Sequence, residues 1–437
     1  MNFADPLVYV RAVHFAATIV AAGVIFFQVL IAEPAFAAAH GALRPDFEGL
    51  RRRLVALVAV SLIIAALSAA VWLVLLAADI YDAPVGEICI NGDAWRVASQ
   101  TRFGGVLLGR LGLAVALALT LFVAGNAPLR RPLRSVAVIL AAAFLIAPAW
   151  TGHAGATPGR GGEFLLGADA LHLLAAGAWV GGLIPLALLL AAARRATEPE
   201  WTSVTATAAV QRFSWLGIAC VGSLVATALV NAWYDVGTFD ALIATDYGRL
   251  VLLKLGLFVA MVALASINRF RLTPRLAAAG VAAALQRNTI AEAALGFAAV
   301  AVVGFLGAMA PASHLHEHAA YGGAVPADAA FAHIHSDQGM AEVTIIPGHA
   351  GTARASIQLL NENFEPLAAQ DVTLTLIAPQ TAAKPITYLA APAADGTWQV
   401  GRIALPQPGN WTVAVRAALG PKRRLDVAAP IVIEPAP

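Results

Sequence analysis

Charged residues are scarce in this chain. Asp, Glu, Lys and Arg make up 12% of its 437 residues, whereas hydrophobic residues make up 59%, and the mean hydropathy is +0.75. A soluble domain carries about 25% charged residues, so the composition excludes a wholly soluble protein and indicates an integral membrane protein with one soluble appendage. The net charge of +2 carries little information, because the placement of charges matters more than their sum.

Sulfur ligands are equally few. The two cysteines lie apart, Cys89 in a polar loop and Cys220 in an apolar segment, and no Cys-x-x-Cys pattern occurs. This argues against a disulfide between them and against thiolate metal chemistry. Four methionines, one of them Met1, are too few for a methionine-lined path for Cu(I). A Gly-x-x-x-x-Gly-Lys-Ser/Thr stretch is absent, so we expect any transport to be driven by a gradient or by ligand exchange and not by a nucleotide. We also expect that the protein is not an enzyme.

Long apolar runs dominate the first 310 residues. Asp5 and Pro6 precede the first run where a secretory signal peptide has basic residues, so we expect that run to remain as a helix. Runs of spanning length, about 20 residues, predict an α-helical membrane fold, an eight-transmembrane-helix bundle. The runs are Leu7–Ala32, Leu54–Ala78, Phe103–Gly125, Leu133–Trp150, Phe164–Ala193, Phe213–Trp233, Tyr247–Ile267 and Thr289–Ala310.

The loops between these runs alternate in charge. Arginines follow the first, third, fifth and seventh runs, as in Arg51–Arg53 and Arg194–Arg195. Acidic residues follow the second and sixth runs, and the loop after the fourth carries His153. The positive-inside rule places the Arg-rich loops in the cytoplasm. Both termini and the His153 loop are then expected outside.

The composition changes after the eighth run, which Pro311 closes. The segment 312–330 contains Gly and Pro and is typical of a linker. Short alternating runs separated by Pro-Gly and Asp-Gly turns then predict a small all-β sandwich. We therefore expect a membrane domain at 1–311, a His-containing linker at 312–330 and a periplasmic β domain at 331–437. The runs are Ala341–Ile346, Ala353–Leu359, Val372–Ala378, Trp398–Ile403, Trp411–Arg416 and Leu425–Ile433.

Ionisable side chains recur at one depth of the predicted helices. His14 and His172 each lie about eight residues into a span that enters from outside, roughly 12 Å deep at 1.5 Å per residue. Asp169 lies one turn shallower on the same face as His172, and Arg110 and Lys254 reach a similar depth. Ionisable residues are costly in lipid and mark sites inside a bundle. We therefore expect an outward-facing site built from several helices.

Imidazole and carboxylate are ligands for copper, zinc or iron. His14, His153 and His172 supply three nitrogen ligands, with Asp169 as a fourth ligand or as a partner that orients an imidazole. The alternative is that each buried histidine only forms hydrogen bonds between helices. The stretch 169–182 also contains Gly177, Gly181 and Gly182, which allow another helix to approach closely.

Two positive side chains complicate a cation site. Arg110 and Lys254 add like charge at the same depth. They can instead pair with Asp169, or serve the propionates of a haem b whose iron is held by two of the histidines. A haem b-binding membrane redox protein therefore remains an alternative.

A second histidine group, His314, His316 and His318, follows the eighth run. Alternate spacing in an irregular segment lets several imidazoles point the same way, which favours a metal role. The alternative is a solvated linker with incidental histidines.

A third group opens the β domain. In an extended strand His333 and His335 project to the same face, and Met340 follows closely. Two histidines and a methionine on a β scaffold form a copper-type ligand set. The alternative is a surface strand whose histidines have no metal role.

These stretches resemble the CopD family of bacterial inner-membrane copper proteins over all eight spans. The matching segments are Arg11–Phe15, Trp150–Ala154, Asp169–Gly182 and Thr245–Phe270. The tail from His333 resembles the YtkA-like β-sandwich domain of some members. The resemblance implies a copper ion as cargo, uptake or resistance as function, and a CopC-type periplasmic copper carrier as partner. Delivery of copper to a periplasmic or membrane enzyme remains an alternative.

Overall fold

The structure is a computed structural model of the whole chain. It describes residues 5–37, 44–81, 83–124, 131–152, 159–195, 201–236, 238–307, 309, 326, 328–336, 339–361, 366–378, 385–420 and 423–436, with the backbone alone at 44–47, 124, 131, 159–160, 201–203 and 335–336. The chain divides into two compact units, a helical one and a β unit that follows it in the sequence.

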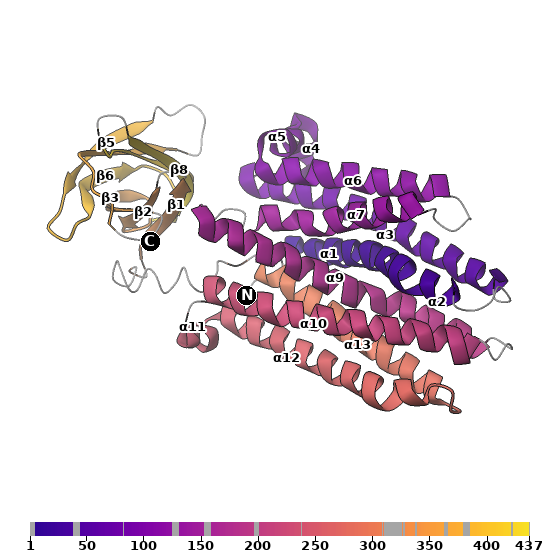
Figure 1. Cartoon of the computed structure of the whole chain (residues 1–437). Helices are drawn as coiled ribbons and strands as arrows, with labels where there is room; N and C mark the ends of the chain where they lie inside the picture. The colour runs from indigo at the N-terminus through magenta and orange to yellow at the C-terminus, as the bar shows by residue number, and fades with distance from the viewer. Residues whose placement is uncertain are drawn as a thin grey trace. The chain divides into compact units, whose positions relative to one another are not determined.

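Within the described residues, eight helices are long and apolar enough to cross a membrane, which confirms the predicted membrane fold (Figure 1). The chain is thus a multi-pass membrane protein. Its helical segments are α1 (Pro6–Phe26), η1 (Phe27–Ala32), α2 (Glu33–Ala37), α3 (Arg44–Tyr81), α4 (Val85–Asn91), α5 (Asp93–Gln100), α6 (Arg102–Ala124), α7 (Arg131–Ile146), η2 (Ala147–Thr151), α9 (Gly159–Arg195), η3 (Trp201–Ala206), α10 (Thr207–Asp235), α11 (Phe239–Ala244), α12 (Asp246–Ile267), η4 (Asn268–Leu272), η5 (Thr273–Arg275) and α13 (Val281–Leu306).

Polar caps fix where several helices begin. Asp5 accepts a hydrogen bond from the Leu7 backbone N–H (2.8 Å), and Pro6 follows at a position where a missing N–H costs nothing. Thr245 Oγ1 likewise accepts from the Gly248 N–H (2.9 Å) at the start of α12. The cap at Thr245 sets how deep into α12 each later side chain lies.

Two helices form the centre of the helical unit. In α1 and α9, 78% and 72% of the most apolar window is buried, against 11–39% in the other six spans. The two helices touch through glycine, because a Cβ at Gly181 would overlap the Ile19 backbone and one at Gly23 would overlap Gly181. The predicted close approach at α9 is confirmed, and Gly177 and Gly182 likewise admit the side chains of Leu145 and Phe213.

The β unit is the predicted small antiparallel β domain. Its described strands form one eight-stranded sheet in the order β1-β2-β3-β6-β5-β4-β7-β8, and β1 lies against β8, so the sheet curls into a near-barrel around its apolar core. All six predicted runs are strands. Of the other two strands, β1 covers the stretch of His333 and His335 that was considered as an extended strand, and β5 is an addition. The strands are β1 (Ala330–Ser336), β2 (Gly339–Ile346), β3 (Gly351–Leu360), β4 (Asp371–Ile377), β5 (Ile386–Pro392), β6 (Trp398–Leu405), β7 (Gly409–Ala418) and β8 (Arg424–Ile433).

Candidate functional site

His172 lies on the central helix α9, and one of its two ring nitrogens forms a hydrogen bond. Its Nδ1 is 2.9 Å from Thr227 Oγ1 on α10. Thr227 donates its own proton to the Ser223 carbonyl (2.7 Å), so it accepts from the imidazole N–H. The proton therefore sits on Nδ1, and Nε2 carries a lone pair. Among the described residues no side chain is bonded to Nε2, so it can serve as a ligand.

Acidic and basic groups surround His172. Asp169, one turn away on α9, accepts from Asn231 Nδ2 at 2.5 Å. The Lys254 ammonium on α12 interacts electrostatically with the carboxylates of Asp169 and Asp235, and Tyr247 donates a hydrogen bond to Asp235. We call this set, with His172 and Thr227, the outer cluster. In their ordinary ionised forms, two carboxylates and one ammonium leave the outer cluster with one negative charge.

The α10 members of the outer cluster were not identified from the sequence. Thr227, Asn231 and Asp235 are spaced four residues apart, so they form one stripe of α10 that faces α9 and α12. This spacing was a usable signal. Asp235 of this stripe adds a second carboxylate. Its negative charge outweighs the positive charge of Lys254, which alone would oppose a cation.

His14, on the other central helix, is fully engaged. Its Nδ1 faces the Ala65 carbonyl (3.0 Å) and Ser68 Oγ (3.1 Å) of α3, and its Nε2 accepts from Arg110 Nη1 of α6 (2.5 Å). Arg110 also donates to Thr18 Oγ1 (2.8 Å). Both residues are buried, with 2% and 4% of their surface exposed. The Arg110 guanidinium thus takes up the Nε2 lone pair of His14 that a bond to a metal would need.

The predicted membrane ligands therefore fall into two environments. His14 contacts α3 and α6, whereas His172 and Asp169 contact α10 and α12. Within the part of the chain that the structure describes, no group of three or more His, Cys, Asp and Glu side chains is arranged to hold a metal ion. His153, His314, His316 and His318 lie outside the described residues.

The β-unit ligands lie on the first two strands. His333 Nδ1 is 3.1 Å from Glu342 Oε1 across the β1–β2 ladder. His335 stands directly opposite Met340, which is 2% exposed; the His335 side chain is not described. Opposed residues of an antiparallel pair share a face. The register thus brings the backbone positions of all three predicted ligands, and of Glu342, to one face.

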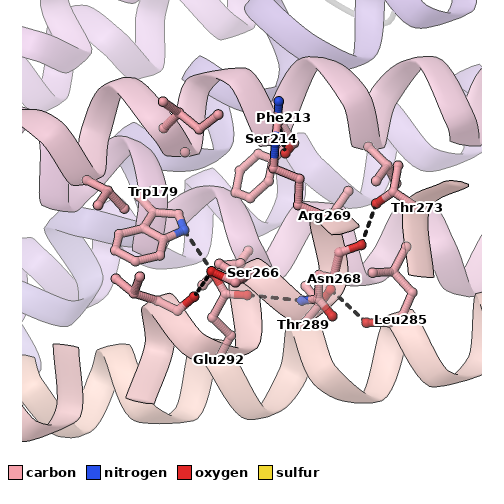
Figure 2. A pocket seen from close by; sticks show the side chains of 18 of the residues that line it. Trp179, Phe213, Ser214, Ser266, Asn268, Arg269, Thr273, Leu285, Thr289 and Glu292 are labelled. Atoms are coloured by element: carbon pink, nitrogen blue, oxygen red, sulfur yellow. Dashed lines mark hydrogen bonds between the residues drawn. The ribbon is translucent and has the colours of Figure 1, made fainter. Parts of the chain in front are cut away.

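A cavity of about 250 Å³ lies between α9, α10, α12, η4 and α13, separate from the outer cluster (Figure 2). Trp179 Nε1 donates to Glu292 Oε1 (2.9 Å), and Asn268 Nδ2 donates to Glu292 Oε2 (3.2 Å). Asn288 Nδ2 in turn donates to Asn268 Oδ1 (3.0 Å). Figure 2 shows Glu292 facing Trp179 inside this lining.

Two family profiles match the helical unit. The profile described as copper resistance protein D matches residues 207–306, which contain the α10 and α12 members of the outer cluster and Glu292. The profile described as copper resistance protein D-like, N-terminal domain, matches residues 2–163, which contain His14 and Arg110. Neither profile covers Asp169 and His172 or the β unit, so the YtkA-like resemblance stays a prediction.

Curated relatives come from several bacteria. The chain is 27% identical to copper transport protein CutJ of Bacillus subtilis over 289 residues, 65% of this chain and 49% of CutJ. It is 34% identical to inner membrane protein YebZ of Escherichia coli over 182 residues, 42% of this chain and 59% of YebZ. It is also 34% identical to copper resistance protein D of Pseudomonas syringae pv. tomato over 181 residues, 41% of this chain and 56% of that relative. The chain thus spans about half to three fifths of these relatives. No solved structure matches it.

Proposed function

Because this chain belongs to the CopD family of copper resistance membrane proteins, we propose that its helical unit carries copper across the bacterial inner membrane, from the periplasm to the cytoplasm. Copper is the cargo in this proposal. The names of CutJ and of the Pseudomonas relative support copper as the substrate, and the name of YebZ supports the inner membrane. The Arg-rich loops support an orientation with both termini in the periplasm.

The observation that carries the proposal is the state of His172. Its Nδ1–H is fixed by Thr227, so its Nε2 lone pair is oriented in advance toward a cation, as in metal sites whose ligands are held by further hydrogen bonds. Asp169 lies one turn away, and with its two carboxylates and its ammonium all ionised the outer cluster has one net negative charge. This charge favours a cation despite the nearby ammonium.

His14 takes a different part in the proposal. Its Nε2 becomes a ligand only after Arg110 moves away, since the guanidinium holds that nitrogen in the described state. His153 is a proposed third membrane ligand from the loop after η2. We place His172 and Asp169 first in the path because no such release step is needed there.

The β unit is proposed as a built-in copper donor. His333, His335 and Met340 would hold copper taken from a CopC-type periplasmic carrier, and His314, His316 and His318 would pass it toward the helical unit. The β1–β2 register supports this, because His335 and Met340 are cross-strand neighbours and His333 shares their face.

Copper binding and uptake test the membrane site. We expect His172→Ala to reduce the copper affinity of the purified full-length protein and cellular copper uptake by at least about tenfold. His349→Ala, which removes an imidazole outside every proposed set, should leave both unchanged. Unchanged affinity and uptake in His172→Ala would refute the proposed site. A haem absorption band in the wild-type protein would instead favour the redox alternative.

A second set of variants separates transport from delivery. His333→Ala/His335→Ala/Met340→Leu in the full chain should slow copper uptake at low external copper and leave uptake at high copper intact. If the triple variant abolishes copper delivery to a copper enzyme while bulk uptake stays normal at every concentration, the protein is a delivery factor and the transport proposal fails.

A further inference from the structure

The cavity around Glu292 is distinct from the copper path proposed above. Its volume of about 250 Å³ gives room for several waters, each of which takes about 30 Å³ in the liquid. The lining is mostly apolar. A carboxyl group in such surroundings needs a defined partner, because an isolated buried charge is costly.

Glu292 has neutral hydrogen-bond donors only. The side chain is 2% exposed, and its two oxygens accept from the indole of Trp179 and the amide of Asn268. Among the described residues no ion pair includes Glu292. The contrast is Glu33 near the end of the first span, which forms an ion pair with Arg134 at 2.6 Å.

Within the part of the chain that the structure describes, the charged side chains that line this cavity are Glu292 on α13 and Arg269 on η4. The lining residues of α9, α10 and α12 are uncharged. Arg269 is committed elsewhere, because its Nη1 donates to Ser214 Oγ (2.6 Å) and its guanidinium lies 4.6 Å from the ring centre of Trp215. The carboxyl group therefore lacks a built-in counter-charge, so its ionised form is neutralised only by a cation that enters the cavity.

The donor set selects among cations. Among the described residues no thiolate, thioether or imidazole lines the cavity, so copper finds there none of the soft ligands or imidazoles that it prefers. Among the described lining residues Glu292 supplies the only carboxylate, and its oxygens already accept from Trp179 and Asn268, so a metal cation finds a single charged ligand there. A proton needs one carboxylate oxygen and nothing more.

We propose that Glu292 is a proton-binding group and that its protonation is coupled to copper movement through the helical unit. The carboxylate takes a proton from water in the cavity at one stage of the cycle and returns it to water at another. This inference rests on the proposed copper transport.

Two helices provide the coupling. Trp179 lies seven residues after His172 on the same stripe of α9, and Asn268 follows Lys254 by fourteen residues, four helical turns. Protonation weakens Glu292 as an acceptor for Trp179 and Asn268. It thereby loosens α9 and α12, two of the three helices that carry the outer cluster.

Flux measurements test the coupling. The full-length protein is placed in liposomes with a luminal pH-sensitive dye, with the membrane potential clamped by potassium and valinomycin, and copper is added outside. Copper influx through the wild type should shift the luminal pH. In Glu292→Gln we expect the pH shift per copper to fall at least tenfold. Thr120→Val removes a hydroxyl of α6 that also bonds to a carbonyl four residues back but lies outside this cavity, and it should retain the wild-type ratio.

The outcomes separate this inference from the proposed function. Copper influx without any pH shift in the wild type, or a wild-type ratio in Glu292→Gln, overturns proton coupling and leaves copper transport standing. Absence of copper influx in the wild type overturns both. Should Glu292→Gln also block copper, Glu292→Asp decides: a return of both fluxes supports the proposal, whereas a folded Asp variant without either flux overturns it.

Discussion

His14 and His172 stand nine residues before Gly23 and Gly181, the contact glycines of the two central helices. At the residue scale, each donates its Nδ1 proton to a fixed acceptor, which leaves the Nε2 lone pair for a second neighbour. Arg110 takes that place at His14. The two histidines have the same sequence separation from the α1–α9 crossing, but only the Nε2 of His172 is available to a metal. Nε2 of His14 faces a guanidinium, whereas His172 faces the outer cluster.

Thr227→Val tests whether the tautomer of His172 matters. The substitution keeps the shape of the side chain but removes the acceptor for Nδ1–H, so the imidazole loses its fixed orientation. We expect copper affinity to fall about tenfold, as for other residues that orient a metal ligand, measured by competition with a copper chelator. Thr120→Val is the matched control, because Thr120 also bonds to a carbonyl four residues back but contacts no histidine. Equal affinities in both variants would contradict the assignment.

The residues of the outer cluster also show what the sequence can predict. Its α9 members follow from charge inside an apolar run, since Asp169 and His172 are costly there without a site. Their partners on α10 and α12 cannot be predicted from the sequence, because the rotation of these helices about their axes decides which polar stripe faces α9. The bond between Arg110 and His14 likewise required the packing of α6 against α1.

At the scale of elements, apolar length was sufficient to predict all eight spans, because a membrane imposes one minimum length on every helix. Strands carry less information. β5 was missed because its residue types do not follow its burial: Leu389 is apolar but exposed, the buried position holds the small residue Ala390, and Pro392 ends the strand. The close packing of another helix on α9, in contrast, was predicted from the glycines of α9, and α1 is that helix.

Gly181→Ala tests the α1–α9 crossing. The added methyl group would overlap backbone atoms of α1, which cannot rotate away, so the helices must separate. We expect a loss of about 1–3 kcal/mol in stability, as for other overpacked cores, seen as a lower unfolding temperature in detergent. Gly256→Ala on α12 meets no atom within 4 Å and should unfold at the wild-type temperature or slightly above it. An unchanged temperature for Gly181→Ala would exclude the described crossing.

At the scale of the whole molecule, the direction of copper movement depends on which way the helical unit lies in the membrane. The outer cluster is near the beginning of α9 and α12 and the end of α10, whereas the Glu292 cavity lies further toward η4. With Arg-rich loops inside, the outer cluster faces the periplasm and the cavity lies toward the cytoplasm. The opposite orientation would present His172 to cytoplasmic copper and turn the proposed uptake into export.

The native cysteines allow this orientation to be measured. Cys89 is exposed in α4, beyond the end of α3, whereas Cys220 is buried inside α10. In a Cys220→Ser background, we expect a membrane-impermeant maleimide to label Cys89 in intact spheroplasts. In a Cys89→Ser/Cys220→Ser background, Arg195→Cys at the end of α9 should be labelled only after the membrane is permeabilised. The reason is that α3 is the second span and α9 the fifth, so their C-terminal ends lie on opposite faces of the membrane. The reverse pattern would place Cys89 in the cytoplasm and reverse the proposed direction of transport, while labelling of both positions in intact spheroplasts would contradict the eight-span fold itself.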